Sequence, residues 1–116
     1  MVDLNVEIYE LLKGICAVSP EFPSMQDEFP VITYAQTSNT ERLTVEGSEW
    51  LSEITYQVDV WDNADSRERV EQIAAEVSAV MSQHHFWRVM GRGFRDNAGL
   101  HRVTMQFRIT VANVFE

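Results

Sequence analysis

Hydrophobic residues recur at helical spacing in two segments of the chain. In the first, successive apolar residues are one, three or four positions apart, which places them on one stripe of a helix: Leu4, Ile8, Leu11, Leu12 and Ile15. The second has the same kind of stripe: Val70, Ile73, Ala74, Val77, Val80 and Met81. Asp3 is placed to cap the first helix, and Asp65 or Ser66 the second, with Glu68 completing a capping box. The pattern predicts one helix over residues 4–14 and another over residues 66–82.

Between and after these helices, apolar and polar residues alternate as they do in β-strands. The clearest alternation covers residues 50–61, where one face is mostly apolar (Trp50, Ser52, Ile54, Tyr56, Val58, Val60) and the other largely polar (Leu51, Glu53, Thr55, Gln57, Asp59, Trp61). Further strands are predicted at residues 31–38, 86–95 and 100–111. Three prolines mark residues 19–30 as a loop, and residues 96–99 read as a turn. Residues 39–49 are polar and form either a surface loop or a projecting hairpin arm.

The order of elements is helix, strand, strand, helix, strand, strand. This order predicts a single α+β domain over residues 1–116, in which an antiparallel β-sheet carries both α-helices packed on its apolar face. The opposite face would stay polar, bearing Thr55, Gln57, Asp59, Arg102, Gln106 and Arg108. Trp61 belongs to that polar face by strand parity.

The charge of the chain is strongly acidic and uneven. A net charge of −9 argues against a dedicated nucleic-acid binder, which needs a basic patch to displace counterions. Residues 1–65 carry 13 acidic and 2 basic side chains, hence −11, whereas residues 66–116 carry 5 and 7, hence +2. Either the two signs mix in space, or neighbouring copies dock acidic surface against basic surface.

The sequence contains no signal for a membrane or a disulfide. Cys16 is the single cysteine, which excludes an internal disulfide, and its apolar neighbours predict a buried thiol. No leader-like segment opens the chain, and no apolar run approaches the ~18 residues of a membrane span. We therefore expect the protein in the cytoplasm of its host cell, or in a particle assembled there.

The chemistry-bearing residues predict neither an enzyme nor a metal or cofactor site. His84, His85 and His101 have no companions at ligand spacing, so solvated or hydrogen-bonding histidines are expected. Gly91 and Gly93 lack the third glycine and following helix of a phosphate loop. No serine lies in a nucleophile elbow. Glu53 and Asp59 share one strand face, where they either pair with Arg102 and Arg108 across strands or are solvated.

Several short motifs, taken in order, resemble the tail-completion (tail terminator) proteins of long-tailed bacteriophages. The motifs are Leu11-Leu12 in the first helix, Phe29-Pro30-Val31-Ile32-Thr33-Tyr34, Ile54-Thr55-Tyr56-Gln57-Val58-Asp59-Val60-Trp61, Asp65-Ser66-Arg67 opening a helix, and Phe107-Arg108-Ile109. The resemblance implies a non-catalytic virion protein of the tail or neck. It would form a homo-oligomeric ring, typically a hexamer, at the head-proximal end of the tail tube. Its partners would be the tube protein and the head connector, with DNA passing through the lumen without specific binding.

The resemblance also suggests where contacts would form. Glu41, Glu46 and Glu49 in the polar segment would border the lumen, or else belong to a solvated loop. The ring interface would use either the edges of the sheet or its polar face, where the candidate residues are Trp61, Asp59, Gln57, Arg102 and Arg108. Trp61, Trp50 and Trp87 are its candidate aromatic anchors, with core packing as the alternative for Trp50 and Trp87. Strand parity makes Trp61 the exception, so its replacement by alanine is expected to weaken ring formation more than folding. Other readings of the whole chain are a neck or stopper subunit of the connector and a small cytosolic enzyme or binding module.

Overall fold

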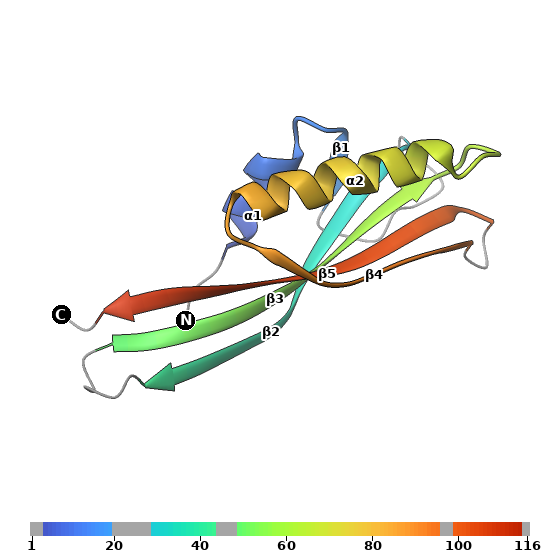
Figure 1. Cartoon of the computed structure of the whole chain (residues 1–116). Coiled ribbons are helices and arrows are strands. Elements are labelled where there is room, and N and C mark those ends of the chain that lie inside the picture. The colour runs from blue at the N-terminus through green and yellow to red at the C-terminus, as the bar shows by residue number, and fades with distance from the viewer. Residues whose placement is uncertain (1–3, 20–28, 44–48, 96–98, 115–116) are drawn as a thin grey trace.

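A single five-stranded sheet with two helices on one side forms the fold (Figure 1). The structure is a computed structural model that describes residues 4–19, 29–43, 49–95 and 99–114. Its elements are α1 (Asn5–Leu12), β1 (Ala17–Ser19), β2 (Val31–Leu43), β3 (Glu49–Asp62), α2 (Glu68–Gln83), β4 (Trp87–Arg95) and β5 (His101–Val114). The strands lie in the order β1-β2-β3-β5-β4, and only the β1–β2 pair is parallel. The predicted α+β class is confirmed.

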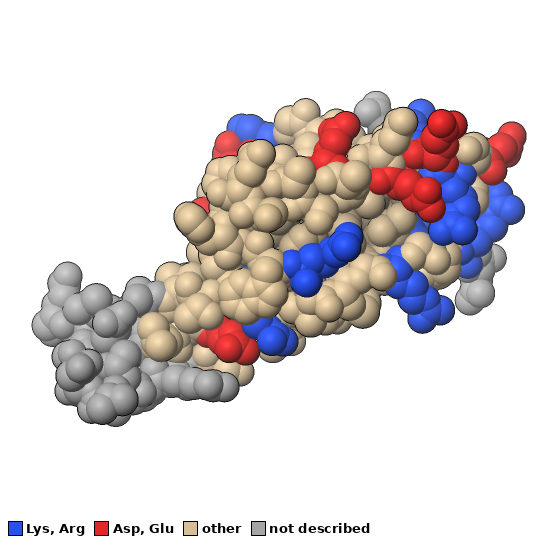
Figure 2. Space-filling view, in the orientation of Figure 1, with Lys and Arg blue, Asp and Glu red and all other residues tan. Residues whose placement is uncertain are grey.

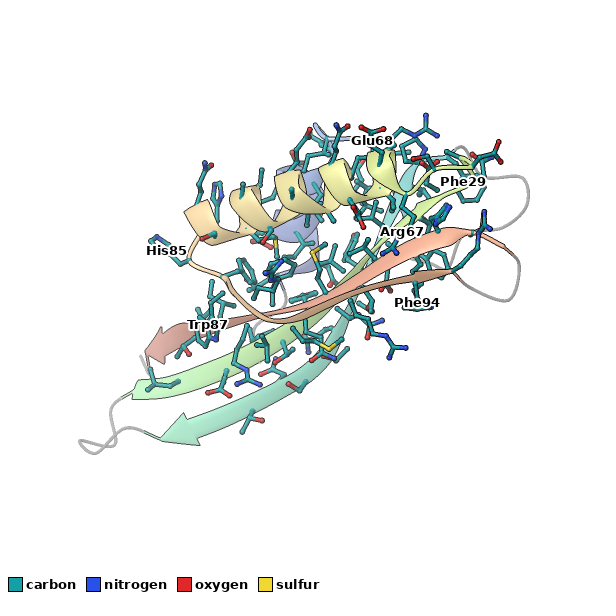
Figure 3. The ribbon with its side chains drawn as sticks, turned by 45° about the vertical axis from the view of Figure 1, so that its right-hand side comes forward. Phe29, Arg67, Glu68, His85, Trp87 and Phe94 are labelled. Atoms are coloured by element: carbon teal, nitrogen blue, oxygen red, sulfur yellow. The ribbon has the colours of Figure 1, made fainter. Side chains whose placement is uncertain are left out.

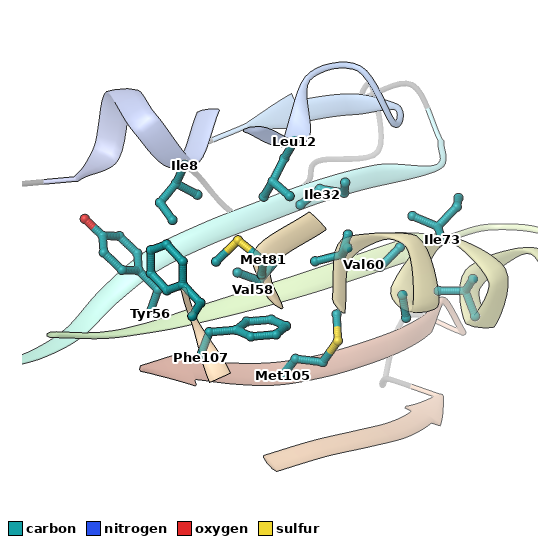
Figure 4. Close-up of a cluster of buried hydrophobic side chains, with 14 of the residues drawn as sticks. Ile8, Leu12, Ile32, Tyr56, Val58, Val60, Ile73, Met81, Met105 and Phe107 are labelled. Atoms are coloured by element: carbon teal, nitrogen blue, oxygen red, sulfur yellow. The ribbon is translucent and has the colours of Figure 1, made fainter. Parts of the chain in front are cut away.

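Both helices cover the face of the sheet that the alternation marked as apolar. Tyr56, Val58 and Val60 of β3 point toward the helices and are fully buried. They form one buried cluster with Ile8 and Leu12 of α1 (Figure 4). The same cluster contains Val77 and Met81 of α2 and Met105 and Phe107 of β5. Each fully buried side chain of this size contributes roughly 1.5–3 kcal/mol through removal of apolar surface from water. The two stripes predicted from helical spacing are therefore what holds the layers together.

The hairpin of β2 and β3 is longer than expected. Strand pairing continues from Val31↔Trp61 to Leu43↔Trp50, so most of residues 39–49 is strand, and the second alternative, a projecting hairpin arm, is confirmed. Residues 44–48 lie outside the described part of the chain. β5 pairs with β3 along this whole length, and the three strand ends extend past the helices (Figure 1). The molecule is accordingly elongated, with extents of 55 × 25 × 23 Å.

Two local predictions differ from the structure. No strand was predicted before residue 31 and a loop was expected from Ser19 onward, but Ala17–Ser19 forms β1, which pairs in parallel with the start of β2. The start of α2 is also different: the helix begins at Glu68 with Arg67 at the N-cap, so the predicted capping box from Asp65 is wrong. Ser66 still stabilises the start of α2, because its Oγ accepts a hydrogen bond from the Glu68 amide at 3.1 Å.

Candidate assembly surfaces

Four of the predicted interaction residues, Trp61, Asp59, Gln57 and Arg102, form one cluster on the helix-free face of the sheet. Arg102 of β5 lies directly opposite Trp61 of β3 in the register, and its guanidinium carbon is 4.2 Å from the centroid of the Trp61 ring. Its Nη2 donates to Asp59 Oδ2 at 3.1 Å. A guanidinium that stacks on an indole and also binds a carboxylate is held in one orientation, because both contacts use its plane.

The same cluster buries Trp61 within the isolated chain. The Trp61 side chain is only 4% exposed, and its Nε1 donates to Thr33 Oγ1 at 2.8 Å. Gln57 Nε2 donates to the same Asp59 oxygen at 3.0 Å. Trp61 is thus already covered before any partner binds. Arg102, with its side chain 18% exposed, is the more accessible member of the stack.

A second, more open cluster lies further along the same face. Arg108 Nε is 3.3 Å from Thr55 Oγ1 and 3.6 Å from Glu53 Oε1. The Arg108 and Glu53 side chains are 37% and 38% exposed, so this ion pair contributes little to stability. The cross-strand pairing of Glu53 and Asp59 with arginines of β5 is confirmed, and the solvated alternative is not needed.

Two of the three glutamates of the polar segment, Glu41 and Glu49, lie in strands of the arm, away from these clusters. Glu41 belongs to β2 opposite Ser52, and Glu49 opens β3 opposite Val114. Glu46 lies outside the described residues. The backbone therefore places the two described glutamates at the end of the sheet that extends past the helices, and their role in the lumen stays a prediction.

The junction between β3 and α2 is organised by a buried carboxylate. Asp62 ends β3 with a fully buried side chain, and Arg69 of α2 donates to both of its oxygens, from Nε at 2.9 Å and from Nη2 at 2.5 Å. These hydrogen bonds, against the opposing effect of burial, hold the pKa of Asp62 below its usual value. They also raise the pKa of Arg69. His101, the residue opposite Asp62 in β5, places its Nε2 3.2 Å from the Asp65 carbonyl oxygen.

β4, the last strand of the sheet, forms a surface whose arginines were not among the interaction residues predicted from the sequence. β4 pairs only with β5, and all of its residues except Phe94 are exposed. It carries Arg88, Arg92 and Arg95 and no acidic residue. Trp87, Val89 and Met90 are exposed large hydrophobic residues on the same strand, at 48%, 43% and 40%. The signal was present in the sequence as three arginines within nine residues that contain no carboxylate.

These three arginines differ from the other basic side chains that the structure describes, because they form no ion pair with a described residue. Lys13, Arg67, Arg69, Arg102 and Arg108 each hold an acidic partner, whereas no ion pair joins an arginine of β4 to another described residue. Arg92 instead lies 5.3 Å from the centroid of the Phe94 ring. At the end of the molecule opposite the arm, where β4 ends and α2 begins, several basic side chains lie next to acidic ones (Figure 2).

A shallow hollow of about 250 Å³ separates β4 from α2. Small residues form much of its lining, Ala74 and Ala75 from the helix and Gly91 and Gly93 from the strand. Arg67 crosses this space from the start of α2 toward β4 (Figure 3). A Cβ on Gly93 would lie 2.8 Å from Arg67 Nη2, so the glycine is what lets the guanidinium lie over the strand.

A larger and almost entirely apolar hollow lies at the other end of the helices. Its volume is about 410 Å³, and it is bordered by α1, the end of α2 and the arm part of β5: Leu4, Val6, Leu11, Phe86, Ile109 and Val111, with Glu7, Glu10 and His84 at its margin. Val6 is 71% exposed beside it. The composition of this hollow offers apolar contact area and few groups that could orient a polar ligand.

The histidines take the structural roles expected of them. His84 Nδ1 lies 3.0 Å from the Val80 carbonyl oxygen at the end of α2, and His85 is exposed in a turn with φ 72°. Within the described ranges, no group of three or more His, Cys, Asp or Glu side chains is placed to hold a metal ion. None of the described helices is long and apolar enough to cross a membrane.

Comparison with known proteins places the chain in a family. The profile described as "Tail completion protein gp17" matches residues 5–112, which is nearly the whole chain. The chain therefore belongs to the tail completion protein family, as its motifs predicted, and it is a structural protein of the phage tail. No curated protein sequence matches it.

Among solved structures, a chain from the "Virion of native gene transfer agent (GTA) particle" has a similar fold. The TM-score is 0.67 at 15% sequence identity, and the match covers 91% of this chain and 92% of that chain. At this identity the likeness concerns the fold alone.

Proposed function

We propose that this protein forms a ring, of six copies, at the head-proximal end of the tail tube, where it ends tube polymerisation and joins the tail to the head connector. The observation that carries the proposal is the family match over residues 5–112. The fold shared with a protein of a gene transfer agent virion agrees with it. The partners would be other copies of the chain, the tube protein and the connector.

The shape and charge of the chain support an assembly role. A head-to-tail ring needs two different surfaces on opposite sides of each copy. This sheet has an open edge at β4 and, on its other side, a β2 that β1 covers only at Val31–Thr33. A net charge of −9 would let DNA pass through the lumen without adhering.

Deletion of the gene from the producing phage, followed by electron microscopy of the particles, tests the proposal. Overlong or irregular tails that are not attached to DNA-filled heads are expected. Free tails of normal length beside leaking heads would instead assign the chain to a stopper on the head side. Intact, infectious virions would refute a role in the particle.

A further inference from the structure

The apolar hollow beside α1 and the exposed residues of β4 are complementary in polarity and in charge. The hollow has a volume of about 410 Å³ and an almost entirely apolar lining, with Glu7 and Glu10 of α1 at its margin. β4 has the opposite combination, because its exposed apolar side chains, Trp87, Val89 and Met90, alternate with arginines and with no carboxylate. Each surface therefore offers the apolar contact and the charge that suit the other.

The charged groups of both surfaces are available for a contact between copies. Glu7, in the first turn of α1, is exposed and forms no ion pair with another described residue. Glu10 pairs with Lys13, but both side chains are more than half exposed, so exchanging that partner for another cation costs little. Arg88 and Arg92 of β4 are exposed as well and have no ion pair with a described residue. Two arginines and two glutamates can therefore pair when one surface meets the other.

The two surfaces face opposite sides of the sheet. Phe86 is buried and lines the hollow on the side of the helices. The next residue, Trp87, lies opposite Arg108 in the register, and the Arg108 side chain contacts Thr55 on the helix-free face. Directly opposite residues of an antiparallel pair share a face, so Trp87 points away from the helices, and the register gives Met90 the same orientation. Each copy thus has a projecting side and a receiving side, as a head-to-tail contact requires.

We infer that the start of β4 of one copy docks into the apolar hollow of a second copy. Trp87 inserts among the apolar side chains of the lining, and Arg88 and Arg92 lie against the two glutamates of α1 at the margin. The inference rests on the proposed ring and specifies one of its interfaces. Because every copy carries both halves of the contact, the contact repeats from copy to copy.

Charge decides against the two symmetric alternatives. Two β4 strands that pair around a two-fold axis would bring six arginines together without a carboxylate. Two hollows that face each other would bring Glu7 and Glu10 of both copies together. The mixed contact is the one of the three that places opposite charges side by side, and it is also the one that does not close after two copies.

A phosphate backbone is a weaker match for β4 than an apolar protein surface. Arginines alone would suit DNA, but the exposed Trp87, Val89 and Met90 have no counterpart on a phosphate chain. The chain as a whole, at −9, would repel DNA. An exposed tryptophan between arginines is typical of the centre of a protein contact, where it fills a pocket of the partner.

Photochemical cross-linking in producing cells tests the contact directly. The photoreactive p-benzoylphenylalanine replaces Trp87, and covalent dimers of the chain are isolated after irradiation and mapped by mass spectrometry. The expected product is a dimer in which position 87 of one copy is joined to residues 4–11 or 109–111 of another. The same probe at Val6, which is 71% exposed beside the hollow, should give dimers joined to β4 of a second copy.

The failure of this inference differs from the failure of the proposed function. Dimers joined elsewhere, cross-links to DNA, to the tube protein or within one copy alone, or no covalent dimer at all would overturn the inference. None of these results bears on tail completion, which the deletion phenotype tests separately.

A charge exchange provides a second test. The strand variant R88E/R92E and the helix variant E7R/E10R are each supplied to the deletion phage from a plasmid. We expect each variant alone to reduce the yield of normal-length tails by roughly tenfold or more, because like charges then meet in the contact. A chain with both sets of changes should restore the yield to within a few-fold.

The matched control is E68R/E76R, which reverses two exposed charges of α2. Glu68, like Glu7, lies in the first turn of its helix, so the control reproduces the effect of the reversal on a helix end. It should leave the yield unchanged, and the thermal midpoints of all purified variants should stay close to that of the wild type, since the altered side chains are exposed. Normal tails from either charge variant, or a folded combined variant that does not restore them, would overturn the inference.

Discussion

Asp62 at the end of β3 and Arg69 in the first turn of α2 form a two-pronged ion pair, with Arg69 Nε and Nη2 each bound to a different carboxylate oxygen. The Asp62 side chain is fully buried, whereas that of Arg69 is half exposed. Asp62 Oδ1 also accepts a hydrogen bond from the Ala64 amide at 3.4 Å. One side chain therefore joins the strand, the turn and the helix that the central motif of the chain connects.

Replacing Asp62 with asparagine should lower the free energy of unfolding by about 1–2 kcal/mol. The amide keeps the shape but loses the charge that both Arg69 donors bind, and hydrogen bonds to a charged group contribute about 1.5–3 kcal/mol before the exposure of Arg69 is considered. Urea denaturation measures the change. The control is Glu10→Gln, since both side chains of the Glu10–Lys13 pair are more than half exposed and its loss should leave the free energy of unfolding almost unchanged. Equal effects of the two variants would contradict a special role for Asp62.

The same ion pair should make stability depend on pH in the acid range. The folded-state pKa of Asp62 lies below its ordinary value of 3.8, so its stabilising contribution is fully present above pH ~5. The contribution is lost as the pH falls through the depressed value, because the folded state must then take up a proton. The difference in unfolding free energy between wild type and Asp62→Asn should be constant from pH 5 to 7 and shrink below pH ~4. A difference that grows on acidification would contradict the assignment.

The main fold could be predicted because its signals are local. Alternation along residues 50–61 assigned every described side chain of β3 to the correct face, and helical spacing found the stripes of α1 and α2. β1 was missed because three residues are too few to show alternation, and its pairing with β2 depends on a contact distant in sequence. The end of β2 was left open between a loop and a hairpin arm, because the polar composition of residues 39–43 resembles that of a loop.

The side-chain contacts on the faces of the sheet could be predicted only in part from the sequence. Parity placed Trp61, Asp59 and Arg102 on one face, but only the register of β3 against β5 shows that Arg102 covers Trp61. The open β4 edge could not be recognised without the strand order, which makes β4 the last strand of the sheet. Whether an arginine is paired depends on neighbours across strands and helices, which composition does not specify.

Removing the Tyr56 hydroxyl should loosen the start of α1. Tyr56 is fully buried in β3, and its hydroxyl donates to Asn5 Oδ1 at 2.9 Å and accepts from the Leu4 amide at 3.2 Å. Tyr56→Phe should cost about 1 kcal/mol of unfolding free energy and speed hydrogen exchange at the first amides of α1, since it removes their anchor. Tyr9→Phe, at an exposed position of the same helix, is the control and should change neither quantity.

Alanine substitutions at Trp61 and Trp87 should have opposite effects: the first should lower mainly the stability of the fold, and the second should impair mainly assembly. Trp61 was considered from the sequence as an anchor of the ring, with a larger effect on assembly than on folding. Its burial beneath Arg102 reverses the expected order, and Trp61→Ala should cost roughly 3–5 kcal/mol of unfolding free energy. Trp87 is 48% exposed, so Trp87→Ala should cost less than about 1 kcal/mol but reduce the yield of normal-length tails. If the Trp61→Ala protein were as stable as wild type but failed to assemble, Trp61 would instead be an anchor of the ring interface, as the sequence suggested.

The single cysteine should react slowly in the folded protein. Burial raises the pKa of the half-buried Cys16 thiol to about 11, and the thiolate is the reactive species. At pH 8 an unfolded cysteine with a pKa near 8.5 is roughly one-quarter thiolate, whereas a pKa of about 11 leaves on the order of one in a thousand. Labelling with iodoacetamide, followed by mass spectrometry, should therefore be at least tenfold slower in native buffer than in urea at the same pH. The ratio of the labelling rate in urea to that in native buffer should fall as the pH rises toward 10, because a growing fraction of the native thiol is then ionised. Equal rates in the two conditions would mean that the segment from Ile15 to Ala17 opens readily and does not shield the thiol.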